Sequence, residues 1–189
     1  MIAGQPSLAW NLMLLLTIFF VTILISGTIS LVSDMIMVTS TIFVAFLILL
    51  GIVVLGIVFD IIGVAVTSAD EKPFHSMAAR KVPGSIEAIR LLRNAERVSS
   101  ICNDVVGDIC GVVSGAAAAT IAAQMLHNFA FSVPRIVTLM MSAVVAGLTV
   151  GGKAMGKTFA IHACTEIVAF VGKFIYFFRR IPQLFTRKK

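Results

Sequence analysis

The sequence predicts an all-α integral membrane bundle of about four transmembrane helices plus juxtamembrane amphipathic helices. Of its 189 residues, 59% are hydrophobic and only 13% are charged, which is about half the charge of a typical soluble domain. The mean hydropathy is +1.04. Four apolar stretches meet or approach the roughly 20 residues that a helix needs to cross a membrane. The length leaves room for one membrane domain and short appendages, which excludes a separate catalytic domain.

The apolar stretches can be assigned in chain order. The first covers residues 8–31 and forms an additional N-terminal helix within residues 1–34, since Ser33 and Asp34 make a polar break after it. No Lys or Arg precedes it and it is too long for a secretory signal. Three further stretches lie at 35–68, 98–126 and 136–150, and the last is short. Glycines and lysines follow at 151–157, then a helix-like apolar segment at 159–178 and a basic tail at 179–189.

Residues 70–97 differ from the stretches on either side. From Ile86 onward, apolar residues recur at helical spacing, with Ile89 and Leu92 on the same side, while charged residues take the other side. This pattern is typical of a helix that lies at the membrane interface.

The basic residues predict the orientation. All but one of the 15 Lys and Arg residues lie in 70–97 or after Val150, and only Arg135 remains for the other side. Because positive charges concentrate on cytoplasmic segments, we expect both termini and the 70–97 connection in the cytoplasm of a multi-pass protein in the cell membrane. These charges flank spans instead of forming a soluble basic face, which excludes nucleic acid as a partner. Attraction of the tail to anionic lipid is expected as a secondary effect.

Three carboxylates fall inside apolar stretches. Asp60 lies in the second stretch, and Asp104 and Asp108 lie one helical turn apart in the third, after Asn103. A charge within a span costs roughly 2.5–3.5 kcal/mol on insertion scales and needs a partner. The four side chains Asp60, Asn103, Asp104 and Asp108 supply the oxygen ligands that Mg²⁺ prefers. The alternative is that Asp104 and Asp108 are solvated at the cytoplasmic end and pair with basic residues there.

Small residues and lysines accompany these acids. Gly107, Gly111 and Gly115 recur every four residues, which lets another helix approach closely and predicts a packing face. Lys153 follows two glycines at the expected broken end of the fourth stretch, where it is either a counter-ion for the aspartates or a side chain reaching to the interface; the second reading is the expectation for Lys157.

Other reactive residues carry no catalytic pattern. Cys102, Cys110 and Cys164 are interpreted as reduced, packed thiols, with a soft-metal role for Cys102 and Cys110 as the minor alternative. The three histidines lack ligand spacing. Without a nucleophile–base pair, a phosphate loop or a heme signature, the sequence does not favour an enzyme.

Several segments resemble the CNNM transmembrane domain, the membrane core of CorB- and CorC-type magnesium transporters. They are VTSADEKPFHSMAARKVPGSIEAIRLLRNAER at 66–97, SSICNDVVGDICGVVSGA at 99–116 and GKAMGKTFA at 152–160. The resemblance implies that residues 35–178 form a homodimeric bundle around a cytoplasm-facing polar cavity that holds Mg²⁺, with a belt-like helix at 86–97. Where the family has an S-x-S-E signature, this sequence has Asp60-Ile-Ile-Gly63, and Lys153 replaces a family glutamate.

Two functions are compared at this stage. The first is a membrane transport core for a divalent cation, with Mg²⁺ as the expected ion, that works by alternating access. The second is a non-transporting scaffold or regulatory subunit that binds a partner through the Gly107–Gly115 face, its acids paired with lysines. A proton-linked carrier of a small organic solute is a weaker third. Family transporters usually carry CBS domains that bind nucleotide, whereas this sequence stops at Lys189. We therefore expect either a separate regulatory polypeptide or an unregulated or repurposed membrane core.

Overall fold

The computed structural model describes residues 8–128 and 134–186, and within them all regular structure is helical, as predicted. The elements are α1 (Leu8–Thr39), α2 (Ile42–Ser68), α3 (Lys72–Ala79), α4 (Ser85–Arg93), α5 (Ala95–Ser100), the π-helix η1 (Ile101–Gly107), α6 (Asp108–Asn128), α7 (Pro134–His162) and α8 (Cys164–Thr186). The predicted outer loop falls partly in 129–133, and Arg187, Lys188 and Lys189 of the tail lie outside the described residues.

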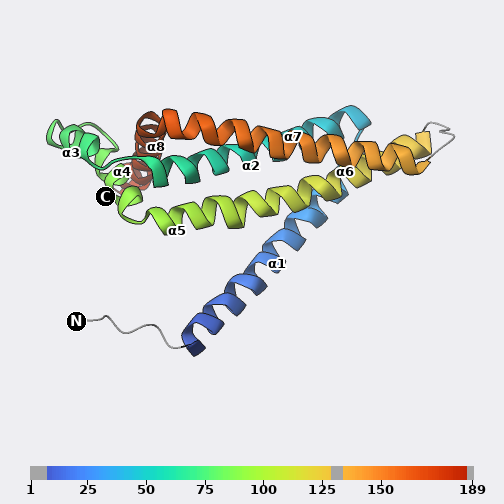
Figure 1. Ribbon diagram of the computed structural model, residues 1–189, viewed down its shortest axis with the longest axis horizontal. Coiled ribbons are helices and arrows are strands. Elements are labelled where there is room, and N and C mark those ends of the chain that lie inside the picture. The colour runs from blue at the N-terminus through green and yellow to red at the C-terminus, as the bar shows by residue number, and fades with distance from the viewer. Residues whose placement is uncertain (1–7, 129–133, 187–189) are drawn as a thin grey trace.

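Four segments are long and apolar enough to cross a membrane, which makes the chain a multi-pass membrane protein. They are Phe19–Met37, Ile42–Ser68, Ala95–His127 and Arg135–His162. Helices α2, α6 and α7 run side by side, whereas α1 crosses α6 near one end and then diverges diagonally from the bundle (Figure 1). Helices α3, α4 and α8 gather at the opposite end, which we call the basic end because Lys72, Arg90, Lys173 and Arg180 are among its residues.

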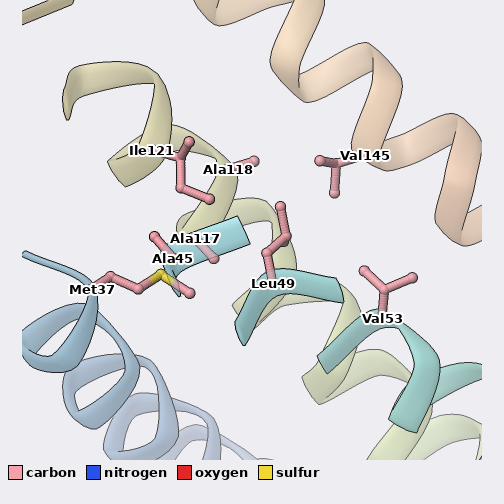
Figure 2. Packing of buried hydrophobic residues seen from close by; sticks show 8 residues of the cluster. All are labelled: Met37, Ala45, Leu49, Val53, Ala117, Ala118, Ile121 and Val145. Carbon is pink, nitrogen blue, oxygen red and sulfur yellow. The ribbon is translucent and has the colours of Figure 1, made fainter. Parts of the chain in front are cut away.

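Aliphatic side chains and alanines from α1, α2, α6 and α7 form a packed hydrophobic core. Met37 of α1, Leu49 and Val53 of α2, Ile121 of α6 and Val145 of α7 converge there (Figure 2). Between them, Ala45, Ala117 and Ala118 allow the helices to approach closely. In a bilayer the surroundings are as apolar as leucine, so this close van der Waals packing holds the helices together.

Helix α1 does not stop at Ser33 and Asp34, and the predicted break there is wrong. The helix continues to Thr39 because the Asp34 carboxylate accepts a hydrogen bond from the Thr120 hydroxyl of α6, at 2.8 Å. The chain turns instead after Thr39, where the Ser40 hydroxyl donates to the Ile36 carbonyl at 2.6 Å. A polar side chain with a partner on a neighbouring helix does not need to end its own helix.

Helix α7 is also longer than predicted. The fourth stretch was expected to end near Val150 with a broken, glycine-rich terminus, but α7 runs unbroken through Gly152 and Gly156 to His162. A Cβ on Gly152 would meet the Ile57 side chain of α2, and one on Gly156 would lie 2.8 Å from Cγ1 of Ile61. These glycines therefore permit close packing of α7 on α2.

The predicted helix-like segment at 159–178 is divided between two helices. Helix α7 ends at His162 and α8 begins at Cys164, and α8 lies across the basic end instead of along the bundle (Figure 1). It packs on α4 through a glycine pair, since the Gly84 carbonyl oxygen would lie 2.6 Å from a Cβ on Gly172. Gly84 has φ +89°, a conformation that favours glycine.

The amphipathic segment at 86–97 is likewise two helices. Helix α4 ends at Arg93, where the Asn94 side-chain amide donates to the Arg90 carbonyl at 2.9 Å. Helix α5 then starts at Ala95 and leads through η1 into α6, so the third span begins three residues before the predicted Val98. Leu92 and Ala88 of α4 are buried beside Phe74 of α3 and Val168 of α8. The short helices of the basic end therefore pack together around a hydrophobic core of their own.

Candidate functional site

Asp60 is the most buried acidic side chain in the described part of the chain. It lies in the apolar helix α2 and its residue surface is 3% exposed. Its Oδ2 atom is buried and has no hydrogen-bond partner within the described residues. Lys157 of α7 is the nearest cation, with Nζ 4.0 Å from that oxygen, and its side chain is 54% exposed. A carboxylate in this position requires a positive partner, and one that is half exposed at 4.0 Å compensates it only partly.

Asn103 brings a second acceptor to the same helix contact. Its Nδ2 donates to Ser99 Oγ at 3.2 Å, whereas its Oδ1 is buried and unpaired among the described residues. The side chain presses against Gly63, one turn after Asp60 on α2, and a Cβ on Gly63 would overlap Oδ1. Gly63 therefore makes room for Asn103, and two unsatisfied oxygens, one from Asp60 and one from Asn103, lie along the contact between α2 and η1.

The element that carries Asn103 is unusual. Residues Ile101–Gly107 form a π-helix inside the third span, and π-helical turns inside α-helices are frequent at functional sites. One carbonyl of this segment, that of Gly107, accepts a hydrogen bond from Lys153 Nζ at 3.4 Å. Lys153 is half-buried, so an ammonium group of α7 fills the space beside Gly107.

The four predicted ligands do not come together. Asp104 and Asp108 are exposed in the single chain, on a different side of the helix from the contact with α2. The inward positions are Cys102, Gly107 and Cys110, and a Cβ on Gly56 of α2 would lie 2.9 Å from Cys110 Cβ. Asp104 follows Asn103, which contacts α2, and Asp108 follows the buried Gly107, so both acids are turned away from these contacts. In the described ranges, no three His, Cys, Asp or Glu side chains converge as a metal cluster would require.

The predicted glycine face is divided in the same way. Gly107 is buried and contacts Lys153 within the chain, whereas a Cβ on Gly111 or Gly115 would meet no atom within 4 Å. Gly111 and Gly115 therefore pack against no helix of the described chain. They share an open side of the third span with Asp104 and Asp108.

The two lysines do not have the contacts that the sequence predicted for them. Lys153, the proposed counter-ion, contacts a backbone carbonyl, while Lys157, expected only to reach toward the interface, is the one that faces Asp60. Sequence reasoning missed Gly63, which makes room for Asn103, and gave no role to Ser99, a polar residue one turn earlier that accepts the Asn103 hydrogen bond. A Gly one turn after a buried acid was the available signal for Gly63.

The cysteines are free thiols, as predicted. Cys102 and Cys110 are buried and Cys164 is half-buried.

The chain was compared with protein-family models, with curated proteins and with solved structures, and none of them matches.

Proposed function

We propose that this protein is a membrane transport core for a divalent cation, with Mg²⁺ as the first ion to test. The observation that carries the proposal is the pair of buried, unpaired oxygens, Asp60 Oδ2 and Asn103 Oδ1, beside a π-helical turn. A carboxylate and an amide oxygen on two helices are hard ligands of the kind that Mg²⁺ uses together with retained water molecules. Asp104 and Asp108 are too exposed in one chain to complete this pair.

Lys157 gives this site an exchange mechanism. Its ammonium occupies the position of a cation beside Asp60 and its side chain is half exposed, so it can withdraw when an ion arrives. The arriving ion then bonds to Asp60 and Asn103, and its departure returns Lys157 to the carboxylate. In this way the buried charge is compensated in both states, as alternating access through a membrane requires.

All but one of the 15 Lys and Arg residues lie in 70–97 or after Val150, and this bias supports a cytoplasmic position for the basic end. We therefore infer that both termini lie on the cytoplasmic side of the cell membrane. We also infer that the cation site opens toward the cytoplasm, between α2, η1 and α7. The same proposal includes a homodimer in which the third spans of two copies pack through their open sides. The two helices would come closest at Gly111 and Gly115.

A thermal-stability experiment tests the ion site. A ligand present at about 100 times its dissociation constant stabilises the folded state by about 2.7 kcal/mol. We expect Mg²⁺ to raise the melting temperature of the purified protein, and we expect Asp60→Asn and Asn103→Ala to remove that response. Asp104→Asn is the matched control, because it removes the same charge at an exposed position and should keep the response. A Mg²⁺ response that survives Asp60→Asn, or one lost in Asp104→Asn, would reject this site.

A non-transporting scaffold or regulatory subunit is the second candidate. It is favoured by Lys157, which lies 4.0 Å from Asp60 and partly compensates the buried acid without a bound ion, and by the open glycine side of α6. Liposomes that contain only this protein and a Mg²⁺ indicator separate the two functions. Flux that depends on Asp60 supports the transporter, and absence of flux together with absence of a Mg²⁺ effect on stability supports the scaffold.

A further inference from the structure

Helix α8 presents a row of aromatic side chains away from the protein. Phe170, Phe174, Phe177 and Phe178 are 72%, 57%, 64% and 58% exposed. Their spacing of four, three and one residues places them on one side of the helix. Lys173 and Arg180 lie one turn from Phe177, one on each side along the chain, and are also exposed. We call these six residues the α8 aromatic–basic face.

This face cannot turn into the bundle, because the opposite side of α8 is already packed. Val168 and Gly172 are buried, and a Cβ on Gly172 would lie 3.0 Å from Ala88 Cβ of α4. The helix lies across the basic end of a bundle whose spans cross a membrane (Figure 1). A helix in that orientation, with phenylalanines on one side and basic residues at the edge, suits the boundary between lipid headgroups and acyl chains.

A cavity beside this face has matching chemistry. It has a volume of about 170 Å³ and is lined by Phe74, Met77, Val82, Pro83, Ser85, Ala169, Phe170 and Lys173. Most of these side chains are apolar and suit a hydrocarbon segment, and Lys173 adds an ammonium group. Two turns further along α8, the Arg180 guanidinium donates to the Tyr176 hydroxyl at 3.3 Å and keeps further N–H donors for a phosphate.

We propose that the α8 aromatic–basic face binds an anionic phospholipid of the adjacent leaflet. The phenylalanines lie among the acyl chains, the part of one chain closest to the headgroup lies in the cavity beside Phe170, and Lys173 and Arg180 contact the phosphate. The charge is complementary, because both basic residues attract a negative headgroup. This site is separate from the Asp60 site and does not depend on cation transport.

Depth-dependent fluorescence quenching tests the location of α8. In a Trp10→Phe background, which removes the single tryptophan, Phe174→Trp reports on the face. His75→Trp is the control, since the His75 side chain is 53% exposed and α3 is the outermost helix of the basic end (Figure 1). In bilayers of brominated phosphatidylcholine we expect quenching of the Phe174→Trp emission and not of the His75→Trp emission. Quenching of the Phe174→Trp emission by aqueous iodide would place the face in water, and quenching by neither agent would place it against a second copy. Either result would overturn the proposal.

The second measurement tests the charge. Mixing brominated phosphatidylglycerol into phosphatidylcholine gives the binding constant of the anionic lipid relative to the neutral one at the Phe174→Trp probe. We expect preference for the anionic lipid and about a fivefold loss of that preference in each of Lys173→Gln and Arg180→Gln, the equivalent of one basic residue near an anionic surface. Lys72→Gln on α3 is the control and should change nothing. Equal binding of the two lipids, or a preference that both variants retain, would overturn the anionic-lipid assignment.

Discussion

Replacement of Gly63 by alanine tests the contact that places Asn103 against α2, one turn from Asp60. A Cβ at this position would overlap Asn103 Oδ1 and lie 2.8 Å from its Cγ and 3.1 Å from its Nδ2. All of these atoms belong to one side chain, which also donates to Ser99 at 3.2 Å. The amide must therefore swing away and lose its hydrogen bond, or α2 and η1 must separate.

The expected cost follows from three contributions. Overpacking costs about 1–3 kcal/mol and the lost hydrogen bond about 1 kcal/mol, while alanine improves helix propensity over glycine by about 1 kcal/mol. Gly63→Ala should thus destabilise the protein by about 1–3 kcal/mol. The matched control is Gly111→Ala, where a Cβ meets no atom within 4 Å, so only the propensity gain of about 1 kcal/mol remains.

The two variants should therefore differ by about 2–4 kcal/mol. For a chain of this size, each kcal/mol corresponds to a melting-temperature change of about 2–4 °C, so Gly63→Ala should melt roughly 4–16 °C below Gly111→Ala. A thiol-reactive dye provides the assay, because Cys102 and Cys110 are buried and react only on unfolding. Equal melting temperatures for the two variants would refute the placement of Asn103 against Gly63. A low melting temperature for Gly111→Ala would instead place a partner helix on the open side.

Three further outcomes are expected. Lys157→Gln should raise the Mg²⁺ affinity about fivefold, since it removes a half-exposed cation that competes for Asp60 and contributes about 1 kcal/mol; isothermal titration measures it. Thr120→Val should lower the melting temperature by about 2–4 °C, because it removes the hydrogen bond to Asp34 that joins α6 to α1. Gly172→Ala should weaken the packing of α8 on α4 by about 1–3 kcal/mol, because its Cβ has no room there; amide hydrogen exchange in α4 measures it.

Each of these variants has a control in the same chain. Lys72→Gln removes an exposed lysine away from the site and should leave the Mg²⁺ affinity unchanged. Thr28→Val removes a hydroxyl that bonds only to the Leu24 carbonyl of its own helix, at 2.7 Å, and should not loosen α1 from α6. Gly27→Ala adds a Cβ to open space and should leave exchange in α4 unaltered. If a control variant changed as much as its partner, the effect would be general and the specific contact would be rejected.

The periodicity of the sequence was sufficient for the class of fold and failed at the helix ends. Continuous apolar stretches predict spans because only a helix satisfies its own backbone within lipid. The helix limits depended on partners in other helices. Asp34 remains within α1 because Thr120 bonds to it. Gly152 does not end α7, because its missing side chain makes room for Ile57 of the neighbouring helix α2.

The sequence by itself determined that this chain is a multi-pass helical membrane protein with a costly acid at Asp60, since hydropathy and charge are properties of each stretch alone. Only the tertiary structure decided which polar groups meet. Facing side chains depend on helix rotation, and a step of one residue along η1 separates Asn103 at the α2 contact from the exposed Asp104. The pairing of Lys157 with Asp60, and the turn that lays α8 across the basic end, arise for the same reason: both are set by packing between helices far apart in the chain.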